Sequence, residues 1–296
     1  MGRDLALTFP VARQTFEEAN DALGFDVAEL CFHGPEEQLR LTEFTQPAIF
    51  TVSVAALRVL AEAGVTADYL AGHSLGEYSA DVAAGAIEFA AAARTVRRRG
   101  QLMQEAVPAD QGSMAAVLGM QAEAVAALCE DASKETGAPV EPANLNSPEQ
   151  IVISGATGAV ERAIALAKER GARRAVLLQV SAPFHCSLMR PAQDALAPIL
   201  QEIPFASAKV PVVVNVDATL VTDGAALRDA LIRQVTGAVR WTESMQLLIE
   251  EGVTTFIEVG PGKVLSGLLR QIDRNQKCAQ VEDPATLEKL LAILSV

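Results

Sequence analysis

The stretch LAGHSLGEYSA, from Leu70 to Ala80, places one serine between two glycines at the end of an apolar run. The pattern Gly72-His73-Ser74-Leu75-Gly76 matches the GxSxG nucleophile elbow, in which a strand turns sharply into a helix with the serine at the turn. We expect both glycines to be required by crowding at the turn, and backbone N–H groups at the helix start to face a developing oxyanion. The stretch therefore predicts a strand–turn–helix unit with a reactive serine. A tight turn with a capping serine is the alternative interpretation.

Strand-like and helix-like segments alternate around this unit. Apolar, β-branched runs at 210–216 and 254–260 predict two more buried strands. Between them, apolar residues recur at helical spacing over 224–235 and 241–252. This alternation favours an α/β fold with a parallel sheet.

The middle of the chain has a different order of elements. Between Gly112 and Leu178 the patterns predict strand, helix, strand, strand, helix, strand. This order is the split unit of ferredoxin-like folds. We therefore expect an inserted ferredoxin-like subdomain at 112–178, flanked by residues 1–111 and 179–296, which together form one discontinuous α/β core.

Composition limits the classes of protein to be considered. Of 296 residues, 50% are hydrophobic and 21% are charged, and the formal net charge is −13. The acidic balance argues against a nucleic-acid partner. No uninterrupted apolar stretch approaches the roughly 18 residues of a membrane span, and the start of the chain does not resemble a secretory signal. The four cysteines are scattered without a CxxC pair, which argues against a structural metal site and favours the cytoplasm.

A serine nucleophile needs a base, and the chain has three histidines. The side chain of His73 should point away from its neighbour Ser74, and His33 is expected in a solvated surface loop. His185 follows the last strand of the inserted unit, in a loop between subdomains where clefts form. His185 is therefore the predicted base, against the alternative of a structural histidine. Because no carboxylate obviously completes a triad, we predict a Ser–His dyad.

One arginine lies on an apolar helix face. Arg99 shares a stripe with Ala92, Val96 and Met103 at helical spacing. A buried guanidinium there requires a carboxylate partner. The partner is either an internal Asp or Glu or the carboxylate of a substrate, and helical spacing does not distinguish them. Three more arginines, at 94, 97 and 98, lie off the stripe, and solvation is expected to account for them.

Eight motifs in order resemble those of the malonyl-CoA:acyl carrier protein transacylases. They are TEFTQPAIFT, GHSLGEYSA, RRRGQLMQEAVP, NLNSPEQIVISG, SAPFHCSLM, VPVVVNVDA, LIRQVTGAVRWTESM and EVGPGKVLSGLL. The resemblance runs over nearly the whole chain. It implies a hydrolase-like parallel-sheet core with the ferredoxin-like insert described above.

The resemblance also implies roles for individual residues. Ser74 is then the nucleophile and His185 its general base, while Arg99 binds the free carboxylate of the malonyl group. The Leu75 N–H would hold the oxyanion, and the Gln234 main-chain carbonyl would orient the imidazole. Gln46 and Asn146 would line the pocket, and Phe184 would narrow it against an α-methyl group.

The reaction implied is ping-pong transfer of malonyl from malonyl-CoA to the phosphopantetheine thiol of acyl carrier protein. It would serve fatty acid or polyketide synthesis and would need no cofactor or metal, no nucleic acid and no membrane. A serine esterase or thioesterase is the rival activity. Family members usually open with a strand and a Gly-Gln-Gly-Ser-Gln loop, and Met1 resembles a later point. Losing that loop's oxyanion donor is expected to cost about 10²–10³ in rate, which leaves an inactive truncated relative as a further alternative.

Overall fold

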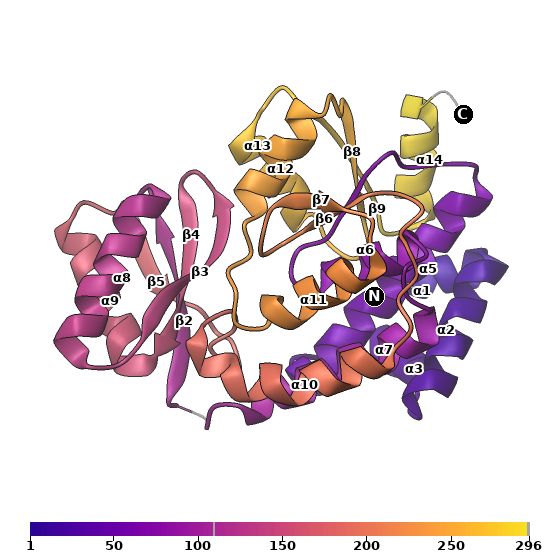
Figure 1. The fold of residues 1–296 in the computed structure, drawn as a ribbon. Helices are drawn as coiled ribbons and strands as arrows, with labels where there is room; N and C mark the ends of the chain where they lie inside the picture. The colour runs from indigo at the N-terminus through magenta and orange to yellow at the C-terminus, as the bar shows by residue number, and fades with distance from the viewer. Residues whose placement is uncertain (109, 295–296) are drawn as a thin grey trace.

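The computed structural model describes residues 1–108 and 110–294, which form a mixed α/β structure (Figure 1). Five helices precede the first strand: α1 (Arg3–Thr8), α2 (Pro10–Leu23), α3 (Val27–His33), α4 (Glu36–Leu39) and α5 (Thr42–Glu62). The elbow region follows as β1 (Leu70–Ala71), α6 (Gly76–Ala83) and α7 (Phe89–Glu105). The predicted strand–turn–helix unit at GHSLG is therefore present.

The inserted segment has the predicted order of strands and helices. It contains β2 (Gly112–Leu118), α8 (Ala122–Thr136), β3 (Val140–Ser147), β4 (Gln150–Ala156), α9 (Thr157–Glu169) and β5 (Arg174–Leu177). The four strands form one antiparallel sheet in the order β3-β4-β2-β5, with α8 and α9 packed together on its outer face (Figure 1). Alternate residues of β2 face opposite sides: Ala115 and Val117 join the apolar core under the helices, whereas Met114 faces the rest of the molecule.

The remainder of the chain begins with η1 (Ser187–Met189) and α10 (Arg190–Glu202). It continues with β6 (Val212–Val214), β7 (Thr219–Val221), α11 (Gly224–Gln234) and α12 (Trp241–Glu250), and ends with β8 (Thr255–Val259), α13 (Val264–Ile272), β9 (Lys277–Val281) and α14 (Pro284–Leu294). The loop before α12 holds the insert in place: the Leu145 N–H donates to the Val239 carbonyl, and the Val239 N–H donates to the Ala143 carbonyl, each at 2.9 Å.

The expected parallel sheet is only partly present. β1 pairs with β6 in parallel, and β8 pairs with β9 in parallel. Among the described strands these two pairs belong to separate short sheets rather than to one continuous parallel sheet. β7 returns antiparallel to β6 after a tight turn in which Ala218 has a positive φ of 50°, a strand that the sequence patterns missed. The prediction that 254–260 forms a buried strand was wrong about burial. All five residues of β8 are half-buried, because β9 is its only ladder partner among the described strands.

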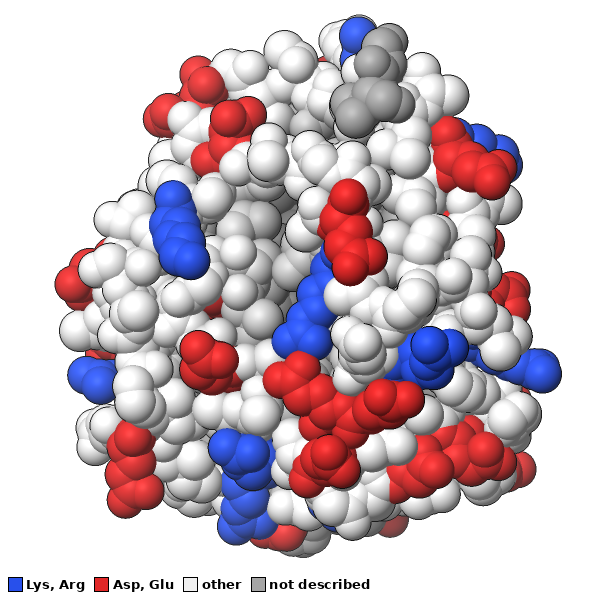
Figure 2. Space-filling view, turned by 90° about the vertical axis from the view of Figure 1, so that its right-hand side faces the viewer, with Lys and Arg blue, Asp and Glu red and all other residues white. Residues whose placement is uncertain are grey.

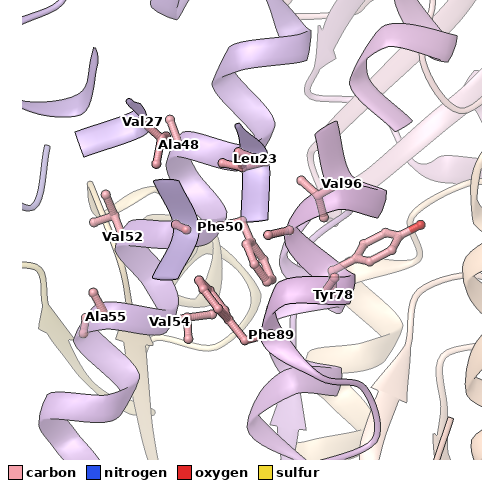
Figure 3. Packing of buried hydrophobic residues seen from close by; sticks show 14 of the residues in the cluster. Leu23, Val27, Ala48, Phe50, Val52, Val54, Ala55, Tyr78, Phe89 and Val96 are labelled. Carbon is pink, nitrogen blue, oxygen red and sulfur yellow. The ribbon is translucent and has the colours of Figure 1, made fainter. Parts of the chain in front are cut away.

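The largest apolar core draws its buried residues from both flanks of the insert, between Leu5 and Met103 and between Ala182 and Leu290. At its centre the rings of Phe50 on α5 and Phe89 on α7 stack with centroids 5.3 Å apart (Figure 3). Stacked and edge-on aromatic pairs add to the free energy gained from burial alone. The two flanks thus share one core.

Helix α5 is long and apolar. It runs 21 residues, and an 18-residue window of it has a mean hydropathy of 1.4, which by length and composition would suffice for a membrane span. The Arg58 guanidinium within this helix pairs with Glu18 on α2 at 2.7 Å. Most of the apolar window is buried against α2 and α7, so α5 is a core helix in this fold.

Charge is dispersed over the face that carries the N-terminal helices and α14. Acidic and basic side chains are intermixed there, and no broad basic area is visible on that face (Figure 2). This distribution agrees with the formal net charge of −13.

Candidate active site

The elbow between β1 and α6 is a strained turn with Ser74 at its tip. Ser74 has a positive φ of 52°, which is uncommon for a non-glycine residue. A Cβ atom on Gly72 would lie 1.9 Å from the main-chain carbon and oxygen of Gly76, so only glycine fits at position 72. A Cβ atom on Gly76 would meet nothing within 4 Å. The expectation that both glycines are crowded is confirmed for Gly72 and wrong for Gly76, because it is the Gly76 backbone that approaches Gly72.

Asn215, in the loop after β6, holds this turn and was missed by sequence reasoning. Its Oδ1 accepts a hydrogen bond from the Ser74 N–H at 2.7 Å, and its Nδ2 donates to the Gly72 carbonyl at 2.7 Å. The sequence signal that could have found Asn215 is its place directly after the apolar run VVV. Because β6 runs parallel to β1, the two strands end at the same edge of the sheet, where ligand-binding sites commonly form.

Ser74 and His185 meet although 111 residues separate them along the chain. The Ser74 Oγ lies 2.7 Å from the His185 Nε2, and the His185 Nδ1 lies 2.9 Å from the Gln234 carbonyl and 3.2 Å from the Gly237 carbonyl. Because carbonyls only accept, Nδ1 carries the proton and the Nε2 lone pair faces Ser74. Burial, reinforced by the nearby Arg99 cation, lowers the pKa of His185 to about 3. The imidazole is therefore a neutral acceptor at neutral pH.

Arg99 is buried beside the serine, with 2% of its surface exposed. Its Nη2 donates to the Ser74 Oγ at 3.1 Å and to the Gln234 Oε1 at 2.9 Å, and its Nη1 donates to the Gln46 Oε1 at 2.7 Å. Among the described residues, no Asp or Glu forms an ion pair with this guanidinium within 4.0 Å. Desolvation lowers the pKa of Arg99 from its ordinary value. Of the two partners left open by helical spacing, the internal ion pair is absent from the described part of the chain.

Gln46, Leu75 and Phe184 were also predicted to be site residues. Gln46 on α5 contacts Arg99 directly, and its Nε2 donates to the Thr42 Oγ1 at 3.0 Å. The N–H of Leu75, the residue after the nucleophile, has no acceptor among the described residues. Phe184 is half-buried beside His185 and packs against the apolar cluster that contains Met114 of the insert.

Asn146 is not brought to the serine itself. Its Oδ1 lies 2.8 Å from the Nε2 of His73, whose ring also packs against Trp241 with centroids 5.4 Å apart. His73 therefore points away from the Ser74 side chain, as expected. Among the side-chain hydrogen bonds of the described residues, Asn146 is connected to the elbow through His73.

Two expectations about surface residues were wrong. His33 is exposed but ends helix α3 rather than lying in a loop, and its Nδ1 lies 2.8 Å from Glu29 one turn earlier. Arg97 is half-buried: its Nη1 donates to the Leu23 carbonyl at 2.6 Å, and its guanidinium lies 4.6 Å from the centre of the Phe25 ring. The neighbouring arginines at 94 and 98 are exposed, as solvation requires.

The acyl transferase domain family matches residues 1–287 of this sequence. The chain belongs to the acyl transferase family. Two curated members of similar sequence are named malonyl CoA-acyl carrier protein transacylase. The one from Bacillus subtilis (strain 168) is 49% identical, with 99% of this chain and 92% of the relative covered. The one from Escherichia coli (strain K12) is 47% identical, with 98% and 94% covered.

Solved structures of acyl transferase family members have the same fold. The malonyl CoA-acyl carrier protein transacylase of Coxiella burnetii superposes with a TM-score of 0.97 at 42% identity, covering 100% of this chain and 93% of that one. A malonyl-transacylase solved in complex with its type II polyketide acyl carrier protein superposes with a TM-score of 0.94 at 47% identity, covering 99% and 94%.

Proposed function

We propose that this chain transfers the malonyl group of malonyl-CoA to the phosphopantetheine thiol of acyl carrier protein, through a malonyl-serine intermediate. One observation carries the proposal: the Ser74 Oγ lies within hydrogen-bond distance of both a neutral imidazole and a buried guanidinium that forms no ion pair with any described Asp or Glu. The names of the relatives support the malonyl substrate. The relative solved with an acyl carrier protein supports the acceptor.

The first half-reaction acylates the enzyme. The Ser74 Oγ attacks the thioester carbonyl carbon while its proton passes to the His185 Nε2. The Leu75 N–H at the start of α6 holds the negative oxygen of the tetrahedral intermediate. The carbon–sulfur bond then breaks, and the CoA sulfur leaves with the proton from Nε2.

The second half-reaction uses the same groups in reverse. The phosphopantetheine thiol gives its proton to the His185 Nε2 and attacks the malonyl-serine carbonyl. The bond to Ser74 breaks, and the Oγ regains the proton. The carbonyls of Gln234 and Gly237 keep Nδ1 protonated throughout, in place of the carboxylate of a triad.

Arg99 supplies the selectivity for a dicarboxylate. The planar guanidinium suits the free carboxylate of malonyl, which would replace neutral acceptors of its Nη1 and Nη2 groups, and Nη2 lies next to the atom that attacks the other end. An acetyl group would leave the buried cation without a negative partner. Gln46 and Gln234 hold the guanidinium in place, Phe184 limits space for an α-methyl group, and Asn146 supports the pocket through His73.

The architecture is proposed to be a hydrolase-like core, residues 1–111 and 179–296, with a ferredoxin-like subdomain at 112–178. The strand order β3-β4-β2-β5 and the separate apolar core within 115–175 support the insert. The absence of any cofactor or metal requirement also stays a prediction, since the acyl group arrives as a thioester. Cytoplasmic location is supported by four free cysteines in the described residues.

The proposal is tested by incubating the protein with radiolabelled malonyl-CoA and holo acyl carrier protein, with Ser74→Ala as the control. Label should pass to the carrier protein, and intact mass spectrometry without carrier should show one malonyl adduct on the wild type and none on Ser74→Ala. Release of free malonate would identify a thioesterase. Absence of the adduct would identify an inactive relative.

A further inference from the structure

We propose that Glu77 is a positioning residue that orients both halves of the site, the nucleophile through Asn215 and the base through Gln234. The inference rests on the proposed function. The sequence patterns assign Glu77 only a place in the helix after the elbow. The structure instead places its side chain beneath the elbow, fully buried.

One carboxylate oxygen of Glu77 accepts hydrogen bonds from two distant segments. The Glu77 Oε2 lies 2.8 Å from the Gln234 Nε2 on α11 and 3.0 Å from the Asn215 main-chain nitrogen after β6. A buried carboxylate is costly unless it is hydrogen-bonded. Removing the acceptor leaves the Asn215 N–H unpaired and leaves the Gln234 nitrogen with the Ser74 carbonyl as its remaining close acceptor. Glu77 therefore holds α11 and the end of β6 against the elbow.

Glu77 is one of three contacts that agree on which way the Gln234 side-chain amide points. The Ser74 carbonyl only accepts, so the Gln234 nitrogen must face it at 3.0 Å, and the same nitrogen donates to the Glu77 Oε2. The Gln234 oxygen is then directed at Arg99, whose Nη2 donates to it at 2.9 Å. A flipped amide would point its N–H₂ group at the guanidinium. The same residue presents the main-chain carbonyl that accepts from His185, so a displaced Gln234 would also displace the imidazole.

The contact with Asn215 acts on the nucleophile. Glu77 fixes the Asn215 main chain, and the Asn215 side chain clamps the Ser74 N–H and the Gly72 carbonyl at 2.7 Å each. Misplacing a reacting group by about 1 Å can cost on the order of 10² in rate. A single acceptor thus couples the two groups that must meet for acyl transfer.

Asp81 offers a matched control on the same helix. It lies one turn beyond Glu77 and is equally buried, but neither of its carboxylate oxygens has a hydrogen-bond partner in the described structure. Asp81→Asn removes a buried carboxylate from α6 without touching Gln234 or Asn215. It controls for replacing a buried carboxyl group with an amide and for general effects on the helix.

The test compares Glu77→Gln, which keeps an acceptor oxygen, with Glu77→Met, which has similar length and no acceptor. We expect kcat for malonyl transfer to fall about 10²-fold in Glu77→Met and less than about 10-fold in Glu77→Gln. Asp81→Asn should stay within about 3-fold of the wild type. If Glu77→Met does not fold, Glu77→Asp carries the same expectation, because it keeps the charge but withdraws the acceptor.

A double-mutant cycle separates positioning from general structural support. In a Gln234→Ala background, Glu77→Met should cost much less than it does in the wild type, since part of its effect acts through that side chain. Equal losses in both backgrounds, a wild-type kcat in Glu77→Met, or an equal loss in Asp81→Asn would each overturn the inference.

A second measurement, the rate at which a fluorophosphonate labels Ser74, does not depend on the acyl substrate. Labelling requires only the serine and its base, and the labelling rate should fall in Glu77→Met in parallel with kcat. If the wild type transfers no malonyl but labelling still depends on Glu77, the proposed function fails and the positioning role stands. If the wild type transfers malonyl and neither readout responds to Glu77, only the positioning role fails.

Discussion

The Nη2 atom of Arg99 lies 3.1 Å from the Oγ atom of Ser74. Ser74 lies in the turn between β1 and α6 and Arg99 lies on α7, and the hydrogen-bond acceptors of the guanidinium among the described residues are neutral. Malonyl is short, with a single carbon between its thioester carbonyl and its free carboxylate. A site for it therefore needs the cation immediately beside the nucleophile, which is the arrangement found.

Arg99→Ala should lower kcat/KM for malonyl-CoA by about 10²–10³-fold and raise the relative use of acetyl-CoA. The cause is loss of charge-assisted hydrogen bonds to the carboxylate, which acetyl lacks. Competition assays with both thioesters measure the change in preference. Arg98→Ala is the matched control, because Arg98 is exposed on the same helix. An unchanged malonyl-to-acetyl ratio in Arg99→Ala would remove Arg99 from substrate binding.

Protonation of His185 should couple stability to pH. Burial and Arg99 lower its pKa in the folded state to about 3, below the usual value of 6.5, so the unfolded state binds more protons between these pH values. The wild type should lose stability relative to His185→Gln as pH falls below 6.5, by up to about 1.4 kcal/mol per pH unit. Urea unfolding at pH 7.5, 6.5 and 5.5 measures the difference. Parallel pH dependence of the two proteins would contradict the prediction.

Ionisation of Glu77 should change the free energy of unfolding with pH in the direction opposite to that expected for His185. Burial raises its pKa to about 7 from the usual 4.5, despite the hydrogen bonds from Gln234 and Asn215 and the charge of Arg99, which lower it. The folded state then binds more protons between these values, so the wild type should lose stability relative to Glu77→Gln as pH rises from 4.5 to 7. The same unfolding series checks this between pH 5.5 and 6.5. A wild type that gains stability relative to Glu77→Gln over that interval would show that the sign is wrong.

The two elbow glycines should respond differently to alanine. Gly72→Ala places a Cβ atom 1.9 Å from the Gly76 backbone, so the turn must open, and we expect lower Tm and loss of malonyl-serine formation. Gly76→Ala meets nothing within 4 Å and should retain the wild-type Tm. Thermal unfolding followed by circular dichroism compares the pair. Similar Tm values for both variants would show that the turn is less crowded than the structure indicates.

The order of the elements and the elbow could be predicted from sequence, because both depend on residues near one another along the chain. GHSLG between an apolar run and a helical pattern predicted β1, the turn and α6, and the patterns in 112–178 predicted all six elements of the insert. His185 could be selected because only three histidines exist and one follows the insert. The patterns missed β7, whose three residues return after a tight turn.

The sequence by itself predicted the local structure, that is, which segments form helices or strands, and it selected one serine and one histidine as the candidate reactive pair. Only the tertiary structure decided that Arg99 forms no ion pair with a described Asp or Glu, that Asn215 and Glu77 contact the elbow and its supports, and that Asn146 contacts His73. The side-chain contacts of Arg99, Asn215, Glu77 and Asn146 with the elbow and its supports join residues from 25 to 157 positions apart. Hydrogen bonds and ion pairs depend on distances of about 3 Å and on direction, and chain packing sets those quantities independently of any local periodicity.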